Sequence, residues 1–238
     1  MKVCFTVDME QDCPPFLETF RGIEEGAPRL LKTLKDKQVL ATFFTTGDVA
    51  RRYPKLMQEI VAGGHELACH GDSHRKFSAM DSTSAKQEIQ RSSEALRAFY
   101  PVVSFRAPNL EFPDEYLSIL QDHGYLLDSS QAKYKWAYRK SKRSPSPIRR
   151  IPASVTSSVL RLPKALRFAW LGRIRDPAVL FMHPWEFVDF RKSTLRRDCR
   201  FKTGEPALQC LGENIEFYSR QGASFHRMQD LIGPSISS

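Results

Sequence analysis

Short apolar runs of strand length alternate along the chain with segments whose apolar residues recur at helical spacing. Pro28 and Pro54 stand at predicted helix starts, where a missing N–H costs nothing, and Ser84 with Gln87 predicts a capping box. The pattern predicts strands at residues 2–9, 39–45, 65–69, 102–105, 125–127, 178–182 and 223–225, and helices at 28–37, 54–62, 85–100, 113–122 and 206–220. Strands that alternate with helices are typical of parallel βαβ units, so we expect an α/β barrel or an open doubly wound sheet.

The alternation of strands and helices lapses between residues 131 and 175. Serine, proline, lysine and arginine dominate this stretch around Ser141–Pro145, and we interpret it as a basic inserted loop region rather than a linker between domains. The length of 238 residues is within the range over which an α/β barrel closes as one unit, so we expect a single domain over residues 1–238. The serine-rich tail at 233–238 is predicted to be disordered.

The chain carries 36 lysine and arginine residues against 27 acidic residues, a formal net charge of +9. Much of the excess lies at residues 133–150 and 191–202, so the charge is local. A local basic surface favours anionic partners such as phosphates, nucleic acid or acidic lipids, and it suggests a ligand-facing rim. A soluble basic surface without a partner is the alternative.

Five cysteines, at positions 4, 13, 69, 199 and 210, lack the close paired spacing of a disulfide framework. Cys4 and Cys69 lie in apolar runs, and reduced thiols are typical of the cytosol. The chain begins directly with a strand-like pattern instead of a long apolar signal region, and no later run approaches the roughly 18 apolar residues of a membrane span. We therefore expect a cytoplasmic protein, while peripheral attachment to the inner membrane face stays open.

Polar groups follow the predicted strands at their carboxyl ends. Because the carboxyl ends of parallel strands lie at one edge, where α/β proteins build their sites, we expect these groups to converge. The candidates are Asp8 and Glu10 after the first strand, His70 and His74 after the third, Arg106 after the fourth, Asp128 after the fifth, and His183 after the strand at 178–182.

The pair His70 and His74 is the most informative signal for a metal. Imidazoles four residues apart fall on one side of a helical turn and can bind one divalent cation, although two solvated imidazoles on a polar turn have the same spacing. Asp8 and Glu10 are two positions apart in an extended segment and so point the same way. One of them can complete a His-His-carboxylate triad that leaves open positions for water and substrate, while the other stays free as a base.

Three further strand-end residues suit hydrolytic chemistry. A guanidinium at Arg106 can bind a carboxylate and hold it ionised, and an imidazole at His183 can protonate a leaving group. Asp128 can orient that imidazole through a hydrogen bond, but Asp128-Ser129-Ser130 is equally suited to a helix cap or turn. A plain surface arginine and a structural histidine are the alternatives for Arg106 and His183. Asp12 is a spare candidate ligand that we expect to be exposed, and we interpret the remaining histidines, His65, His123 and His226, as structural.

The order of these residues along the chain resembles the polysaccharide deacetylase superfamily, which comprises carbohydrate esterase family four and its relatives. The resemblance extends from Phe5 to about Asp189, and it implies a distorted, incomplete (β/α) barrel with seven or so parallel strands, a divalent metal, and hydrolysis of an amide on an amino sugar. The matching blocks are Thr6-Val7-Asp8-Met9-Glu10, Ala41-Thr42-Phe43-Phe44, Gly64-His65-Glu66 with the His70–His74 frame, Phe105-Arg106-Ala107-Pro108, Tyr125–Ser129 and Leu180–Pro184.

The resemblance also implies a role for each matched position. Members that act on polymers usually have two adjacent aspartates, the second of which binds metal, whereas Met9 stands here and Glu10 is the nearest carboxylate. Glu10 is therefore assigned as the third ligand, and an exchange of roles with Asp8 stays open. The implied roles are base for Asp8, metal ligand for His70 and His74, orientation of the base for Arg106, acid for His183, and partner of the acid for Asp128.

The Asp-x-Glu form and the run Glu25–Leu31 are more similar to the cytosol-facing deformylase that acts on a formamido-arabinose carried by a polyprenyl phosphate. A basic rim would suit that phosphate. We accordingly expect removal of an acetyl or formyl group from an amino sugar that is polymeric or lipid-linked, in the metabolism of the cell envelope. Imidazole and carboxylate ligands suit zinc, and nickel, cobalt, manganese or iron also fit.

Two other functions stay open. An allantoinase-like hydrolase would keep the barrel but act on a small cyclic or linear amide. A basic nucleic-acid-binding or membrane-binding protein would use the metal only structurally, but closed structural zinc sites generally take four protein ligands, and Cys69 is the only cysteine beside the histidine pair. We expect an N-acylated amino sugar as the partner, peripheral contact with anionic membrane lipid as a second partner to test, and no nucleic acid.

Overall fold

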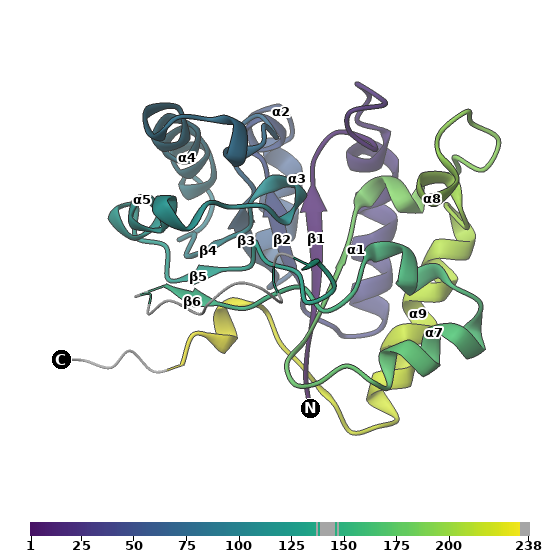
Figure 1. The fold of residues 1–238 in the computed structure, drawn as a ribbon. Coiled ribbons are helices and arrows are strands. Elements are labelled where there is room, and N and C mark those ends of the chain that lie inside the picture. Colours follow the sequence, from purple (N-terminus) through teal and green to yellow (C-terminus); the bar gives the residue numbers. More distant parts are fainter. Residues whose placement is uncertain (137, 139–145, 147, 234–238) are drawn as a thin grey trace.

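The computed structural model describes residues 1–136, 138, 146 and 148–233 of the chain. The strands of this described part form one curled sheet, and helices pack along its outer side (Figure 1). The strands are β1 (Lys2–Met9), β2 (Thr42–Thr45), β3 (Glu66–Cys69), β4 (Ser104–Phe105), β5 (Leu127–Asp128), β6 (Arg149–Arg150), β7 (Ala178–Met182) and β8 (Ser224–Phe225).

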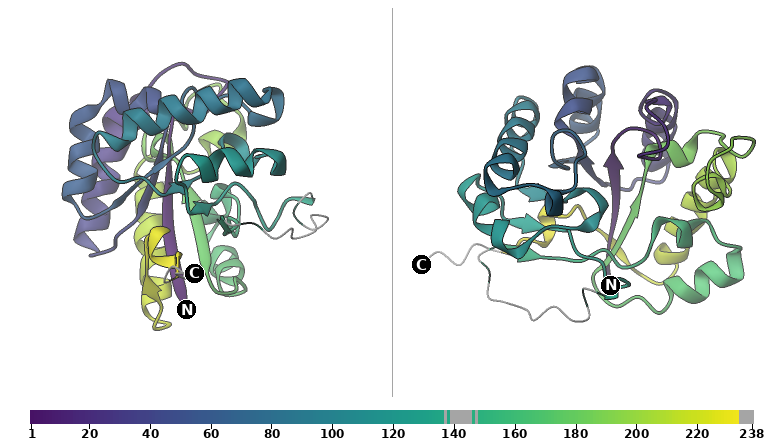
Figure 2. Two further views of the ribbon diagram at one scale, coloured as in Figure 1. Left: turned by 90° about the vertical axis from the view of Figure 1, so that its left-hand side faces the viewer. Right: turned by 45° about the horizontal axis from the view of Figure 1, so that its top comes forward.

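All strand pairs are parallel, and the sheet order is β6-β5-β4-β3-β2-β1-β7, with β8 beside the first residues of β1. In the register of β1, Thr6 pairs with Thr42 on one side and with Phe181 on the other. The two ends of the curl approach each other where the backbone N–H of Ser154, beyond β6, donates to the carbonyl oxygen of Val179 in β7 at 2.8 Å. The predicted distorted, incomplete (β/α) barrel with about seven parallel strands is confirmed (Figure 2).

Helices and single helical turns connect the strands. Three predicted helices, at 28–37, 54–62 and 206–220, agree with α1, α3 and α9 to within one residue, whereas α2 was not predicted. The helices are α1 (Ala27–Asp36), α2 (Gly47–Arg52), α3 (Pro54–Ala62), α4 (Ser82–Arg97), α5 (Leu117–Asp122), α7 (Lys164–Leu171), α8 (Arg197–Arg200) and α9 (Glu205–Ser219). The short turns are η1 (Gly22–Gly26), η2 (Phe77–Ala79), η3 (Pro108–Leu110), η4 (Asp114–Tyr116), η5 (Ser157–Arg161), η6 (Pro184–Phe187) and η7 (Gln229–Leu231).

Two predictions of local structure were wrong. Helix α4 begins earlier than predicted because Asp81 caps it by accepting a hydrogen bond from the Ser84 N–H at 2.7 Å, so Ser84 and Gln87 lie inside the helix. Residues 131–175, expected as a loop region, contain β6, η5 and α7, because buried apolar residues such as Leu160 and Leu171 pack into the main core. The predicted disordered tail lies outside the described residues beyond Gly233.

Strand β1 shows how the sheet separates two environments. Val3, Phe5 and Val7 belong to the large core between the sheet and its helices, whereas Cys4 packs in a second cluster with Phe44 of β2. The even-numbered positions of β1 therefore face the inside of the curl, where Asp8 follows the same alternation. No helix in the described part of the chain has both the length and the apolar character that crossing a bilayer requires.

His65, just before β3, is a buried structural histidine. Its side chain is 4% exposed, and its Nδ1 accepts a hydrogen bond from the backbone N–H of Ala41 at 3.1 Å. Burial and the nearby Arg227 cation lower the pKa of His65 to about 4. The neutral imidazole is therefore part of the folded structure at neutral pH, since only the unprotonated Nδ1 can accept this bond.

We expect His65 to contribute to acid sensitivity. A histidine with an ordinary pKa of about 6.5 in the unfolded chain and a lower pKa in the folded chain takes up protons on unfolding, so stability falls as pH drops from about 6.5 toward 4. From pH 7 to 4.5, urea unfolding of the wild type should lose about 2–3 kcal/mol more than that of His65→Asn, whose amide oxygen can still accept the bond. The control is His226→Asn at a partly exposed position; equal pH dependence of wild type and His65→Asn would contradict this account.

Candidate active site

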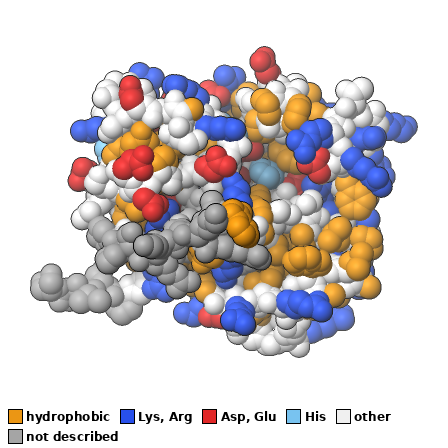
Figure 3. Space-filling view, in the orientation of Figure 1, with side chains coloured by type: hydrophobic (Ala, Val, Ile, Leu, Met, Phe, Trp, Pro, Cys, Tyr) orange, Lys and Arg blue, Asp and Glu red, His pale blue; other side chains and the backbone are white. Residues whose placement is uncertain are grey.

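A cavity of about 260 Å³ opens at the carboxyl edge of the sheet, in the hollow of Figure 3 where a histidine side chain is visible. Among the candidate site residues predicted from the sequence, Arg106, Asp128 and the spare ligand Asp12 are outside its lining. The cavity is lined by Asp8, Glu10, Cys13, Pro14, His70, His74, Asn109, Leu110, Tyr134, Phe181, His183, Trp185 and Cys199. The polar residues at the carboxyl ends of β1, β3 and β7 therefore do converge on one cavity, as predicted.

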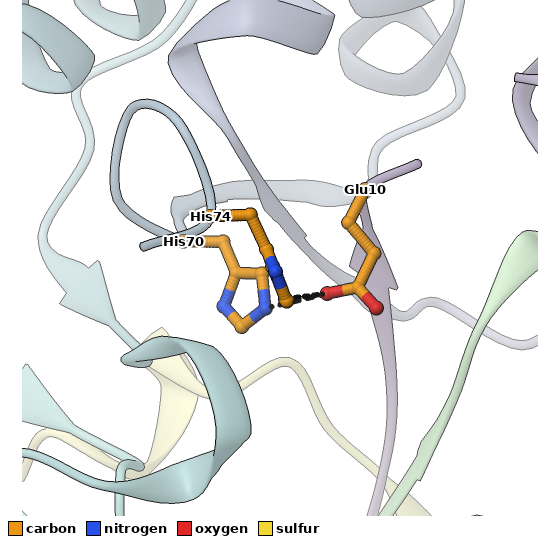
Figure 4. A group of neighbouring side chains, drawn as sticks. All are labelled: Glu10, His70 and His74. Carbon is orange, nitrogen blue, oxygen red and sulfur yellow. Dashed lines mark hydrogen bonds and ion pairs between the residues drawn. The ribbon is translucent and has the colours of Figure 1, made fainter. Parts of the chain in front are cut away.

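The side chains of Glu10, His70 and His74 point toward one another inside this cavity (Figure 4). The Nε2 atoms of His70 and His74 lie 3.1 and 2.6 Å from Glu10 Oε2, and one candidate ligand atom from each residue lies within 4.8 Å of the others. Two imidazole nitrogens and one carboxylate oxygen beside an open space are the donor set of a catalytic zinc site. The three residues therefore fit a divalent metal with a coordination position left for water or substrate.

The histidines are positioned by a loop and not by the helical turn that their spacing predicted. Nδ1 of His70 lies 2.7 Å from the carbonyl oxygen of Arg106, a contact that turns Nε2 toward Glu10. His74 has a left-handed backbone with φ of 57°, which a helical turn would not allow. The loop between the two rings is held by Glu88 of α4, whose Oε1 accepts hydrogen bonds from the backbone N–H groups of Asp72 and Ser73 at 3.0 and 2.6 Å.

The imidazoles stabilise the charged form of Glu10. Burial alone raises the pKa of Glu10, but the charge of His74 and hydrogen bonds from both imidazoles outweigh it and bring the pKa below its usual range. Burial lowers the pKa of His74, whereas the adjacent Glu10 carboxylate raises it, and the net direction is upward. Glu10 is thus ionised at neutral pH, which is the form that binds a cation.

Arg106 holds Asp8 from inside the barrel. Its fully buried guanidinium donates from Nη1 to Asp8 Oδ1 at 2.6 Å and to Thr6 Oγ1 at 2.8 Å, and from Nη2 to Ser129 Oγ at 3.0 Å. The guanidinium carbon lies 4.1 Å from the centre of the Phe44 ring. Charge-assisted hydrogen bonds of this kind fix the orientation of a carboxylate. Arg106 therefore makes the carboxylate contact that the sequence predicted.

His183 is held by Glu186, a residue that the sequence reasoning missed. Glu186 Oε1 lies 2.9 Å from His183 Nδ1, and its Oε2 forms a buried ion pair with Arg161 Nε at 2.8 Å. Burial lowers the pKa of His183, but the hydrogen bond to Glu186 and the surrounding carboxylates raise it to about 9. With Nδ1 directed to Glu186, His183 Nε2 lies 3.8 Å from Glu10 Oε1, on the side of the metal cluster.

The contacts of Asp128 contradict its predicted role as the partner of His183. Asp128 Oδ2 accepts from Arg150 Nε at 3.0 Å, and its Oδ1 accepts from the backbone N–H of Ser130 at 2.9 Å. The partner of Asp128 instead comes from β6, the strand that pairs with β5. The signal that could have identified Glu186 is its position three residues after His183, the spacing of a capping box, which is indeed formed at η6.

Asp12 is buried, contrary to the exposed position that we expected, and it is outside the metal cluster. Its carboxylate accepts hydrogen bonds from Thr19 Oγ1 at 2.7 Å and from the backbone N–H groups of Arg21 and Gly22 at 2.8 and 2.7 Å. These bonds close the loop that follows Glu10. Asp12 therefore shapes the segment that carries the candidate ligand.

Two glycines let the turn η1 lie directly against η6, the turn that follows His183. A Cβ at Gly22 would lie 2.5 Å from the backbone nitrogen of Trp185, and one at Gly26 would lie 2.1 Å from the carbonyl oxygen of Pro184. Any larger residue would force the two turns apart. The glycines thus fix how His183 sits relative to the loop that carries Glu10.

Much of the described basic surface is paired within the molecule. In the first basic stretch, Lys135 pairs with Glu111, and Arg150 with Asp114 as well as with Asp128. In the second stretch, Arg191 pairs with Asp189 and Arg196 with Asp198. Residues 137, 139–145 and 147 of the first stretch lie outside the described residues. The ligand-facing rim stays a prediction.

Comparison with known proteins identifies a family model, described as polysaccharide deacetylase, that matches residues 4–127, more than half of the chain. The peptidoglycan deacetylase of Helicobacter pylori is 32% identical over 109 residues, which are 45% of this chain and 37% of that protein. The chitooligosaccharide deacetylase of Sinorhizobium fredii is 32% identical over 100 residues, 41% of this chain and 46% of that protein. The chain thus spans less than half the length of these curated relatives.

A similar fold occurs in the crystal structure of BA3943 from Bacillus anthracis, described as a pseudoenzyme of the CE4 family. The TM-score is 0.67 at 19% identity, and the match covers 97% of this chain and 65% of that one. Because a pseudoenzyme has the same architecture, a similar fold does not by itself establish catalytic activity. The activity of this chain has to be argued from its own side chains. The match of the family model over residues 4–127 shows that the chain belongs to the polysaccharide deacetylase family.

Proposed function

We propose that this protein is a metal-dependent hydrolase that removes the acetyl group from an N-acetylated amino sugar. The observation that carries the proposal is one cavity that combines a two-histidine, one-carboxylate donor set with a carboxylate held by arginine and an imidazole held by glutamate. Amide hydrolysis needs a site for a cation, a base for water and an acid for the amine. The names of the peptidoglycan and chitooligosaccharide relatives support the acetyl group and the sugar.

Glu10, His70 and His74 would hold the metal. A divalent cation such as zinc, when bound there, polarises the acyl carbonyl and lowers the pKa of a bound water from about 15.7 toward about 7. The chain prepares the ligands for it, because the Arg106 carbonyl oxygen fixes the ring of His70 and the buried position of Glu10 excludes bulk water from its carboxylate.

Asp8 is the proposed base. It lines the cavity and is not one of the three clustered donors, and Arg106 holds it in place by a 2.6 Å hydrogen bond. A carboxylate oriented in this way can accept the proton of the attacking water as the water adds to the acyl carbon. Arg106 is a positioning residue in this scheme, because it acts through Asp8.

His183 is the proposed acid. An amine leaves an acyl group readily only when its nitrogen is protonated, so amide hydrolysis depends on a proton donor more than hydrolysis of an activated ester does. With a pKa of about 9, His183 carries protons on both nitrogens at neutral pH. Nδ1 donates to Glu186, and the proton on Nε2 is available for the leaving amine. The products are acetate and the free amino sugar.

The first test is product release by purified, metal-loaded protein. We expect acetate from N-acetylglucosamine oligomers or peptidoglycan fragments, loss of that activity with a chelator, and recovery when zinc is added back. A formamido sugar and a small cyclic amide complete the panel. Formate release alone would instead favour the predicted deformylase, and ring opening alone the allantoinase-like function. Binding to DNA or acidic vesicles without any product would contradict a hydrolase.

The second prediction separates the roles of the two carboxylates. Glu10→Gln should weaken zinc binding by more than about tenfold in calorimetry, since even losses in the outer shell of a metal site cost about 10–100-fold. Asp8→Asn should bind zinc as the wild type does while its rate of acetate release falls by about 10²–10⁴. If the Asp8 variant loses zinc and the Glu10 variant keeps it, the two roles are exchanged.

The third prediction concerns the partner of His183. We expect Glu186→Gln to reduce amide hydrolysis by at least about tenfold while hydrolysis of an aryl acetate, whose leaving group needs no proton, changes much less. His183→Ala should show the same selectivity with a loss of about 10²–10⁴ on the amide. Asp128→Asn is the matched control, because it removes a buried carboxylate that pairs with Arg150. An equal loss on both substrates in Glu186→Gln would assign Glu186 a purely structural role.

A further inference from the structure

Two cysteines meet in the wall of the active-site cavity although they lie far apart in the sequence. Cys13 follows β1 in the loop that Asp12 closes, and Cys199 lies in α8. Both side chains line the cavity, and both pack in one apolar cluster with Trp185 and Val188. Burial and the neighbouring Cys199 thiol raise the pKa of Cys13 well above its ordinary value. The proposed hydrolysis gives neither thiol a function.

The other three cysteines have different neighbours. Cys69 donates to Ser92 Oγ at 3.2 Å, and Cys210 accepts from Arg167 Nη1 at 2.6 Å. Cys4 donates to the carbonyl oxygen of Arg227 at 3.9 Å. Cys13 and Cys199 are thus the pair that the fold brings together, and Cys199 is partly exposed whereas Cys13 is 3% exposed.

We propose that Cys13 and Cys199 form a modification site, at which a disulfide oxidant such as oxidised glutathione converts the two thiols into a reversible intramolecular disulfide. The proposal stands apart from the hydrolase function, because thiol chemistry requires neither the metal nor the substrate. All five cysteines are free in the structure, in agreement with the interpretation from the sequence, so the proposed bridge would form only on oxidation.

The exchange proceeds in two balanced steps. The partly exposed Cys199 loses its proton, attacks one sulfur of oxidised glutathione and forms a mixed disulfide, which releases one glutathione thiolate. Cys13, whose pKa is raised by burial, loses its proton as it attacks Cys199 Sγ, which breaks the mixed disulfide and releases the second glutathione. The two protons lost by the cysteines are taken up by the two glutathione thiolates. One disulfide is consumed and one is formed.

The bridge would tie α8 to the loop that follows Glu10. In that loop, Cys13 has a left-handed backbone with φ of 46°, and its carbonyl oxygen accepts from the Phe16 N–H at 3.0 Å. Both side chains already line the cavity wall and pack in one apolar cluster, so we expect the bridge to need little movement of the folded chain. It restricts the unfolded chain strongly, since the closed loop is long, and it should therefore stabilise the protein.

The test treats the full-length protein with oxidised glutathione and follows it by thiol titration, peptide mapping and thermal unfolding. We expect the loss of two thiols, a peptide pair that joins Cys13 to Cys199, and a rise in Tm of about 5–15 °C that reducing agent reverses. Cys13→Ser and Cys199→Ser should each abolish the bridge and the rise in Tm. In Cys210→Ser, the matched control, both should persist, because its serine can still accept the hydrogen bond from Arg167.

Three results would overturn the proposal: an unchanged thiol count in the wild type, a glutathione adduct on Cys199 that Cys13 never displaces, or a bridge that joins a different pair. The partly exposed position of Cys199 makes Cys199→Ser the variant expected to fold without difficulty. Acetate release is measured separately on the reduced protein, so failure of the hydrolase and failure of the disulfide are different results.

Discussion

The contact between Arg106 and Asp8 is the interaction on which the site depends. A fully buried guanidinium is tolerated only with compensating partners, and Arg106 finds them on β1, where Thr6 and Asp8 lie, and at Ser129 beyond β5. Loss of one partner from such a buried pair costs about 3–5 kcal/mol, because the other charge stays behind unpaired. The interior of the curled sheet therefore contains a polar hydrogen-bond network around Arg106. This network directs the Asp8 carboxylate toward the cavity.

The sequence predicted the parts of the fold that local pattern decides. The strands at residues 2–9 and 178–182 agree with β1 and β7 because long apolar runs leave few alternatives. The apolar pattern gave the wrong prediction at 131–175, which was expected to be a loop region. Strand β6 has only two residues, and prolines and charged residues there obscure the apolar positions that join the core. Such short strands form because a neighbouring edge offers hydrogen bonds, and that neighbour is not visible in the local sequence.

The sequence likewise predicted only part of the candidate site. Residues at strand ends were predicted to converge, and Asp8, Glu10, His70, His74 and His183 do line one cavity. The pairing of Asp128 with His183 failed because a parallel pattern tells which end of a strand carries the site but not which strands are neighbours. Glu186 lies on the turn immediately after His183, so the partner of His183 is close in sequence, whereas Asp128 belongs to a distant strand.

The loop between Glu10 and Gly26 connects the parts of the site mechanically. Glu10 at its start joins the two imidazoles, Asp12 closes it onto Gly22, and the glycines of η1 touch the backbone of η6 directly behind His183. A displacement of this loop would therefore move a candidate metal ligand and the candidate acid together. Cys13 lies in the same loop and lines the cavity together with Cys199, so a covalent bond there would act on the segment that positions Glu10 relative to His183.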